Sequence, residues 1–345
     1  MNFNIKTMLP FAAISVIGLA VNPAIAADAS YFKGKTMKIV IPYGPGGTYD
    51  KYGHTFSRHL GNHIPGNPNI ILQHMPGAGG SKAMNFSYNI MAKDGLNMVV
   101  PLDNSVVNQM LRPKKMKYKT DKFRWLGSSN QTNVVMVVRS DTGVKTVMDM
   151  KNIAVIGATS GKSSSGYINP QLVWGLLGLK GRMVTGYKGS SRSILAMEQG
   201  EAQMAAFNWL AWASKVPHWF KGDKPFARAM VQVGAFMDPD LPNVPMLSDL
   251  VKSKDKPLVD FMSTAGALGR GLTLPPGVDP RILATLRKAY TAMNADKAFA
   301  AELKKKRLRL MASDGVVIQE IVSKALKSTT PEVVSRLRKV LYGGS

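Results

Sequence analysis

The sequence predicts an α/β protein of two domains, each built on a mainly parallel sheet flanked by helices. Short β-prone apolar runs alternate with helical apolar periods along the chain, a pattern typical of βαβ units. Two of these units, near the start, join strand to helix through glycine-rich loops. A chain of 345 residues is also long enough to bury a separate core in each of two domains.

The first glycine-rich unit starts with the apolar run 37–41 and continues into the loop 42–47. Thr48 and Asp50 then suit the first turn of a helix. Glycine lets the main chain approach a ligand closely, and the N–H groups at a helix N-terminus carry partial positive charge. We interpret this unit as an anion-binding loop, with an ordinary βα turn as the alternative.

The second unit repeats this arrangement. The apolar run 69–73 leads into the loop 74–81, His-Met-Pro-Gly-Ala-Gly-Gly-Ser, and an amphipathic helical pattern begins near Ala83. In a parallel sheet both loops open at the same carboxyl edge, where α/β proteins bind ligands. We therefore expect the two loops to hold one carboxylate together through main-chain N–H groups.

The two loops resemble those of a known family. Pro-Tyr-Gly-Pro-Gly-Gly-Thr-Tyr-Asp at 42–50, followed by Met-Pro-Gly-Ala-Gly-Gly at 75–80, is similar to the substrate-binding receptors of tripartite tricarboxylate transporters, also called Bug proteins. The resemblance extends over nearly the whole mature chain. It implies a two-domain periplasmic-binding-protein (Venus flytrap) architecture and a small carboxylate ligand that is passed to the membrane components of such a transporter. It also implies no enzymatic activity and no cofactor.

The loop motifs and the resemblance together give a set of expected ligand-binding residues. The glycine loops supply main-chain N–H groups, Ser160 lies in a hydroxyl-rich loop, and the resemblance places Asp50, Ser164 and Asn208 near the pocket. The full set is Tyr43, Gly46, Gly47, Thr48, Asp50, Gly77, Ala78, Gly79, Gly80, Ser160, Ser164 and Asn208.

The hydroxyl-rich loop 157–165 does not match two enzyme motifs. A nucleotide-binding P-loop needs a glycine five residues before Gly161, where Ile156 stands. A nucleophile elbow needs a glycine in place of Ser165. In the family this loop usually contains Gly-x-Gly-Ser; Ser163 replaces the second glycine, and Ser164 matches the serine.

The N-terminal segment predicts export. Lys6, the apolar run 11–21 and Ala24-Ile25-Ala26 have the order of a signal peptide cleaved after Ala26, so we expect a periplasmic protein. We also expect it to be a monomer. The expected domains are 27–130 plus 233–345, and 131–232, with crossing strands at 134–139 and 226–233. The chain has no cysteine, which excludes disulfides and thiolate zinc sites.

The composition is strongly basic. Lys and Arg number 45 against 21 Asp and Glu, a formal net charge of +24, which favours the capture of anions. Nucleic acid is an alternative partner for such a chain, but no recognised nucleic-acid motif is present and export argues against it. The segment 112–122 has six Lys or Arg in eleven residues, and we interpret it as a solvated loop.

The spacing of histidine and tryptophan side chains supports further expectations. His59 and His63 are spaced to share one helical face, and we favour a polar solvated face over a metal site. Trp212 and Trp219 have the spacing of core residues. The alternatives to a binding protein are an exported hydrolase acting on a small anionic substrate and a basic structural or adhesion protein.

Overall fold

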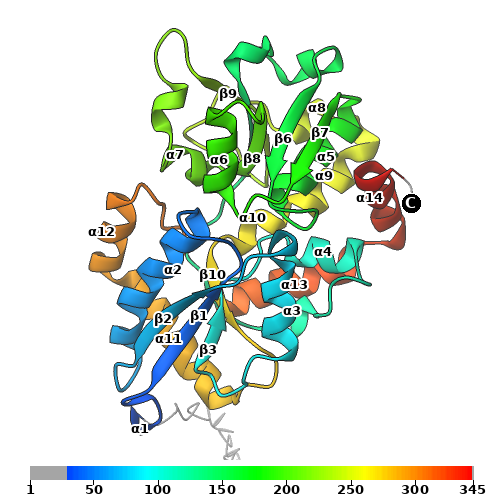
Figure 1. The fold of residues 1–345 in the computed structure, drawn as a ribbon. Helices are drawn as coiled ribbons and strands as arrows, with labels where there is room; N and C mark the ends of the chain where they lie inside the picture. Colours follow the sequence, from blue (N-terminus) through cyan, green and yellow to red (C-terminus); the bar gives the residue numbers. More distant parts are fainter. Residues whose placement is uncertain (1–28, 344–345) are drawn as a thin grey trace, which may run out of the picture.

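A computed structural model describes residues 29–343, and the expected signal peptide lies outside these residues. The chain forms two sheets, each covered by helices (Figure 1). The first has the strand order β11-β4-β10-β3-β1-β2, and the second has the order β7-β6-β8-β5-β9. Each sheet, together with its covering helices, is here called a half of the molecule.

The first sheet is mixed. Its strands are β1 (Thr36–Ile41), β2 (Asn69–His74), β3 (Asn97–Val99), β4 (Arg124–Ser128), β10 (Gly271–Leu274) and β11 (Ser313–Asp314). β1 pairs in parallel with β2 and β3, as the two glycine-rich units predict. β10 returns from a distant part of the chain and inserts antiparallel between β3 and β4, and β11 is antiparallel to β4.

The second sheet is mixed as well. Its strands are β5 (Val134–Arg139), β6 (Val155–Thr159), β7 (Gly181–Thr185), β8 (Met204–Asn208) and β9 (Ala227–Val233). β6 is parallel to β7 and β8, whereas β5 is antiparallel to both β8 and β9. The expectation of mainly parallel sheets is therefore corrected: in each half, strands that enter from the other half run against the βαβ strands.

Helices cover both sheets. The first half carries α1 (Ala29–Phe32), α2 (Thr48–His59), α3 (Ser81–Asn89), α4 (Ser105–Leu111), α11 (Pro280–Ala295), α12 (Lys297–Lys305) and α13 (Gly315–Ser328), and the second carries α5 (Ser165–Leu177), α6 (Ser190–Glu198) and α7 (Trp209–Ala213). Local signals set several ends: the Asp279 carboxylate accepts a hydrogen bond from Arg281 N–H at the start of α11, and Gly178, with φ +66°, ends α5.

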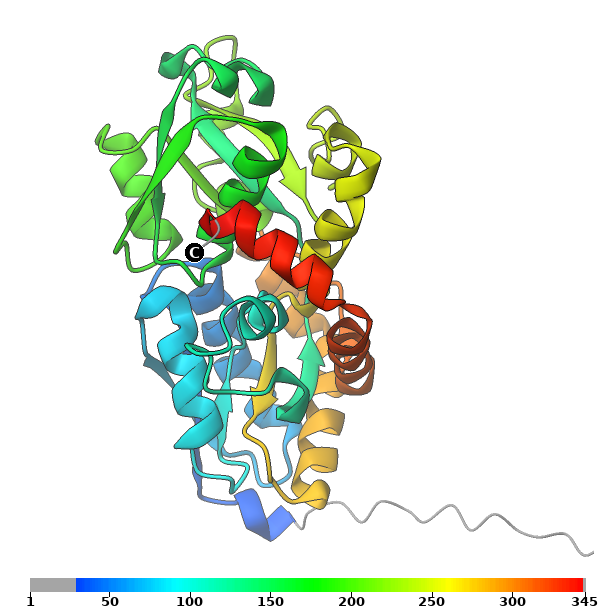
Figure 2. The same ribbon diagram turned by 90° about the vertical axis from the view of Figure 1, so that its right-hand side faces the viewer.

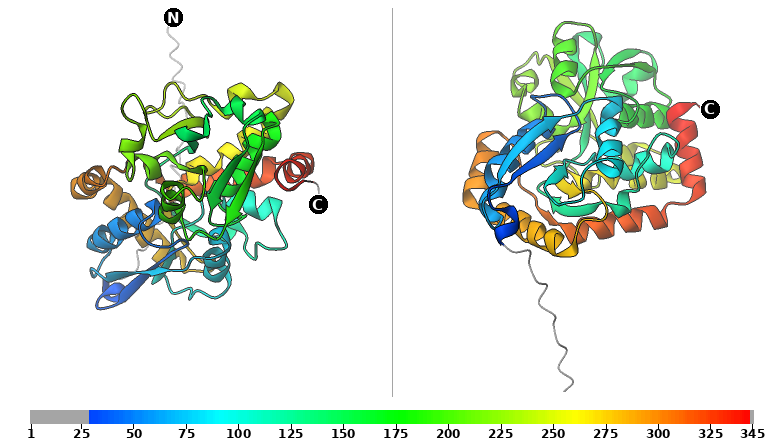
Figure 3. Two further views of the ribbon diagram at one scale, coloured as in Figure 1. Left: turned by 45° about the horizontal axis from the view of Figure 1, so that its top comes forward. Right: turned by 60° about the horizontal axis from the view of Figure 1, so that its bottom comes forward.

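The remaining helices join the halves. They are α8 (Leu247–Leu250), α9 (Lys256–Ser263), α10 (Ala265–Leu268) and α14 (Pro331–Tyr342). α8 and α9 pack beside β9, and α14 packs on both α5 and α4, so it spans the two halves (Figure 2). α12 and α14 lie on opposite sides of the molecule (Figure 3). Because α14 contacts helices of both halves, the domain limits given above stay a prediction.

Short 3₁₀ helices fill several connections. They are η1 (Leu60–His63), η2 (Ala78–Gly80), η3 (Thr120–Lys122), η4 (Ser140–Thr142), η5 (Val147–Lys151), η6 (Pro217–Phe220) and η7 (Ser253–Asp255). Within residues 29–343, none of the helices has both the length and the apolar character needed to cross a membrane.

Aromatic side chains pack together in the interior of each half. Phe56 packs against Tyr290 and Phe299 in the first half, and all three are fully buried. In the second half, Trp212 and Trp219 are buried with ring centroids 6.1 Å apart, which confirms the predicted core role. These large rings remove much apolar surface from water in each half.

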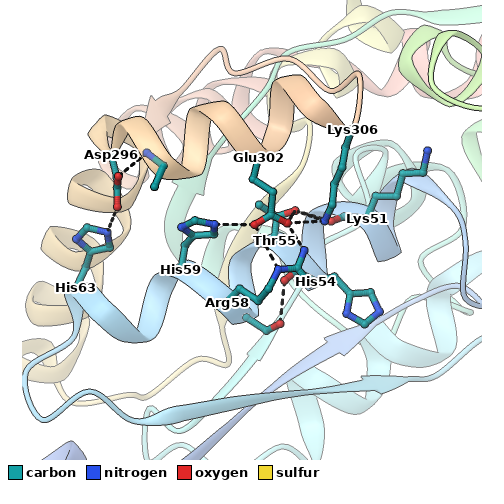
Figure 4. Close-up of polar contacts among 11 residues, drawn as sticks. Lys51, His54, Thr55, Arg58, His59, His63, Asp296, Glu302 and Lys306 are labelled. Atoms are coloured by element: carbon teal, nitrogen blue, oxygen red, sulfur yellow. Dashed lines mark hydrogen bonds and ion pairs between the residues drawn. The ribbon is translucent and has the colours of Figure 1, made fainter.

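The face of α2 that carries the histidines packs against α12 (Figure 4). His59 Nε2 lies 2.7 Å from Glu302, and His63 Nε2 lies 3.1 Å from Asp296. Burial raises the pKa of Glu302, but hydrogen bonds from Arg58, Lys306 and His59 outweigh this and lower it. The expected solvated face is therefore wrong: each imidazole pairs with its own carboxylate and fixes α12 on α2. No cluster of three or more metal-binding side chains occurs among the described residues.

Candidate ligand-binding cleft

A cavity of about 50 Å³ lies where loops of the two halves meet. From the first half it is lined by Tyr43, Gly47, Thr48, Tyr49 and Arg270, and from the second by Ser160, Ser164, Ser165, Gly166, Gly189, Ser190, Phe207, Asn208 and Ala211. Six of the expected residues line its wall, namely Tyr43, Gly47, Thr48, Ser160, Ser164 and Asn208. The space suits a small molecule of a few water-sized groups.

The start of α2 forms one wall of the cavity. Gly47 precedes the helix in an extended conformation, and the first N–H groups of α2 have no partner within the helix itself. A Cβ atom on Gly47 would lie 3.3 Å from the Ser190 hydroxyl of the opposite half. The absence of a side chain at Gly47 thus leaves room at the positive end of α2.

Asp50 braces this loop and is not part of the cavity wall. Its carboxylate accepts a hydrogen bond of 2.7 Å from Gly46 N–H and lies 2.6 Å from His74 Nε2. The side chain is buried, and His54 lies on the same carboxylate oxygen at 3.4 Å. Gly46 and Asp50 are therefore joined to each other within the first loop, and neither is among the residues that line the cavity.

The second glycine loop lines a neighbouring cavity of about 230 Å³. Gly77, Ala78, Gly79 and Gly80 belong to its wall, and it shares only Tyr43 and Ser160 with the first cavity. The Tyr43 hydroxyl donates to the Gly79 carbonyl at 3.1 Å, which ties the two loops together. The two loops therefore line separate cavities. This differs from the expectation that both loops hold one carboxylate together.

The backbones of the two halves approach closely at Gly79. A Cβ atom there would lie 2.7 Å from the Ser164 backbone nitrogen, and the residue has φ +68°. Because a Cβ at that distance would clash with backbone, only glycine allows this contact. The second loop thus contacts the loop after β6 directly.

Side chains also cross between the halves. The Ser163 carbonyl accepts hydrogen bonds of 2.8 Å from the amides of both Asn104 and Asn108. The Ser163 hydroxyl accepts one of 2.6 Å from Arg112 Nη1. A glycine in place of Ser163 could not make the last contact, so this departure from the family pattern adds a bond between the halves. The two halves are therefore in direct contact across the cleft.

Arg270 is a site residue that the sequence analysis missed. Its guanidinium is buried, stacks over the Tyr49 ring at 3.7 Å, and donates to Asp103 at 3.2 Å and to Thr48 Oγ1 at 3.3 Å. Burial lowers the pKa of Arg270, but Tyr49 and Asp103 outweigh it and raise the pKa, so the group is charged. Its Nε has no hydrogen-bond partner.

Asn208 provides a similar free donor from the opposite half. Its Oδ1 accepts a hydrogen bond from Leu210 N–H at 2.9 Å, which fixes the amide orientation at the start of α7. The Nδ2 group is buried and has no partner among the described residues. A buried donor without an acceptor costs about 1–3 kcal/mol. The cavity wall therefore holds donors from both halves that an acceptor ligand would satisfy.

The polar side chains of the cavity wall are mostly neutral. Its lining residues include hydroxyls but no histidine, aspartate or glutamate. The Ser164 hydroxyl is 2.8 Å from Thr159 Oγ1 and donates to the Gly161 carbonyl at 2.8 Å. A serine nucleophile needs an adjacent base, and both partners of the Ser164 hydroxyl are neutral oxygens. Ser190 also lines the cavity, and its hydroxyl accepts a hydrogen bond of 3.3 Å from Lys215 Nζ.

Comparisons with known proteins bear on the family and the fold of the chain. The family model described as tripartite tricarboxylate transporter family receptor matches residues 62–335. No curated protein sequence matches the chain. The similar solved structures described next are 14–19% identical to this chain, and at these identities they show the fold alone.

Solved structures with a similar fold include the periplasmic binding protein BugD. BugD is 14% identical with a TM-score of 0.71, over 90% of this chain and 98% of its own. MatC from Rhodopseudomonas palustris, solved with malate, is 19% identical with a TM-score of 0.69, over 90% and 100%. A second R. palustris protein, solved with adipate, is 17% identical with a TM-score of 0.68, over 88% and 97%. The two-domain periplasmic-binding-protein fold class is thereby confirmed, with mixed sheets.

Proposed function

The chain belongs to the tripartite tricarboxylate transporter receptor family, and from this premise we propose that it is a periplasmic receptor that captures a small carboxylate without chemical change. The ligand passes from it to the membrane components of a tripartite tricarboxylate transporter. The mature protein starts after Ala26, acts as a monomer and binds no nucleic acid.

One observation is the main support for a carboxylate ligand. Arg270 Nε and Asn208 Nδ2 are donors without acceptors in the wall of one cavity, and they come from opposite halves. A carboxylate has two acceptor oxygens and a negative charge, which suits a guanidinium and the N-terminus of α2. Malate and adipate in two related structures support a small dicarboxylate.

The ligand also explains why the halves close. A carboxylate held by Arg270 and Asn208 links the first sheet to the second, so binding favours the closed arrangement in the way of hinged binding proteins. The predicted hinge segments are those near 130–138 and 227–232, which join the two halves.

A calorimetric titration of the mature protein tests the proposal. The panel contains malate, adipate, succinate and citrate, with the uncharged diamide of each dicarboxylate as the matched control. We expect at least one acid to bind with one-to-one stoichiometry and to raise the unfolding midpoint by mass action, while its diamide does neither. Equal binding of acid and diamide, or no binding by any carboxylate, would overturn the ligand class.

A further inference from the structure

A second hollow, whose lining shares no residue with that of the cleft, is strongly basic. It has a volume of about 560 Å³ and is defined here as the basic groove by Arg112, Lys114, Lys115, Lys162, Arg338 and Tyr342. The connector after α4, the loop after β6 and helix α14 supply these side chains. α14 lies across the two halves here (Figure 2). The groove therefore gathers five cations from both halves and has no carboxylate in its lining.

The five cations are not neutralised within the protein. No ion pair among the described residues includes any of them. The two arginines are nevertheless ordered, because Arg338 donates to the Met110 and Leu111 carbonyls and Arg112 donates to the Ser163 hydroxyl. Neutral acceptors thus hold the guanidinium groups in place and leave their charge available.

A buried hydroxyl adds an independent signal. Tyr342 Oη is buried and has no hydrogen-bond partner, although the residue lines the groove. Burial raises the pKa of Tyr342, so the phenol keeps its proton and is a donor. A site that combines unpaired cations with a spare hydroxyl donor is complementary to an anion with several acceptor oxygens.

The closed arrangement places like charges from the two halves together. Lys162 belongs to the second half, whereas Arg112, Lys114 and Lys115 belong to the first. The like charges in this groove repel one another, and the attraction of each cation to a bound anion offsets that repulsion. An anion with a single charge would leave most of the repulsion, so the groove favours a compact anion with two or more charges.

We propose that the basic groove is a second anion-binding site, for a phosphoryl group or diphosphate carrying at least two negative charges. Arginine and lysine together are the side chains that most suit phosphate oxygens. The segment 112–122, which we expected to be a solvated loop, contributes three of the five cations and thus acquires a specific role. The site is separate from the carboxylate cleft, so failure of either proposal leaves the other intact.

Titration calorimetry with sodium pyrophosphate at constant ionic strength tests the site. The test variant is the triple replacement Lys114→Ala, Lys115→Ala and Lys162→Ala. The matched control is Lys297→Ala, Lys304→Ala and Lys305→Ala on α12, which removes the same charge from exposed lysines that form no ion pair among the described residues. We expect saturable binding that falls at least tenfold in the test variant and stays within about twofold in the control.

Two further measurements separate the sources of the phosphoryl group. Tyr342→Phe, which keeps the packing, should weaken pyrophosphate binding a few fold. Sedimentation with phosphatidylcholine vesicles containing phosphatidic acid, lost in the test variant, would assign a lipid headgroup as the source. Pyrophosphate binding without vesicle binding would assign a free anion. Equal losses in the test and control variants, or no saturable binding of either probe, would overturn the proposal.

Discussion

The two glycine loops are similar in sequence but differ in their surroundings. The first loop, at 42–47, lies beside the cavity, and Asp50 and His74 hold it from behind. The second loop, at 76–80, presses its backbone against the loop that carries Ser164. One loop therefore leaves space for a ligand and the other makes the contact that closes the cleft. Similar local sequences thus take different roles according to what the opposite half presents to them.

The largest expected effect comes from filling the contact of the second loop. Gly79→Val should abolish ligand binding, because its side chain would clash with Ser164 and prevent closure. The positive φ adds a folding cost of about 1–3 kcal/mol. Small-angle scattering should give a larger radius of gyration than wild type, unchanged by ligand.

Alanine at the two glycine positions provides the matched comparison. Gly47 has φ −79°, which any residue adopts, and a Cβ there meets only the Ser190 hydroxyl at 3.3 Å. Gly47→Ala should reduce affinity a few fold at most, whereas Gly79→Ala should reduce it far more. Equal affinities for the two variants would show that the loops do not differ in role.

The next largest effect is expected from replacing Arg270, which donates a hydrogen bond to Thr48 directly after the first loop. Replacing Arg270 alone would leave Asp103 as an unpaired buried charge, so we pair Arg270→Gln with Asp103→Asn. Loss of a charged hydrogen bond should weaken carboxylate binding roughly 10- to 150-fold, or about 1.5–3 kcal/mol. Calorimetry measures the change, with Asp103→Asn as the control. Unchanged affinity in the double variant would place the carboxylate elsewhere.

A smaller effect is expected from the brace of the first loop. Asp50→Asn keeps the shape but weakens the acceptor for Gly46 N–H and the contact with His74. We expect a loss of about 1–2 kcal/mol in the free energy of unfolding, measured with urea, and a change in dicarboxylate affinity of a few fold. A selective loss for ligands with an amino group would instead indicate that Asp50 contacts the ligand.

The smallest effect is a pH dependence of stability at Lys215. Lys215 lies near the Ser190 hydroxyl, and burial, followed by Lys51, lowers its pKa to about 8, while Asp50 opposes the shift. The folded pKa is below the ordinary value of 10.5, so between these values the folded state holds fewer protons than the unfolded state. The free energy of unfolding should therefore rise with pH across this window, by about 1 kcal/mol after solvent screening.

Urea unfolding below pH 8 and near pH 10 measures this change. Lys215→Met should remove the rise, since methionine keeps the apolar stem without the amine. A rise of the same size in the variant would assign the titration to another group.

Local sequence was enough to predict the strand, loop and helix of both glycine units. An apolar run, glycines with positive φ such as Gly46 and Gly79, and first-turn residues such as Thr48 act within a few residues of one another. The strand at 134–139 was predicted with the observed bounds because its five apolar residues are consecutive.

The tertiary structure decided which of these residues share a site. β10 has only four residues, bounded by Gly-Arg-Gly and two prolines, so neither the strand nor Arg270 had a clear signal in the sequence. Yet Arg270 meets Thr48 across 222 positions of the chain, and His59 meets Glu302 across 243. Periodicity and turn chemistry specify short segments, whereas such contacts depend on where the chain returns. The sequence alone therefore determined the two loops and the family resemblance, and only the packing of the halves decided which loop faces the cavity, which one closes it, and where the unpaired charges gather.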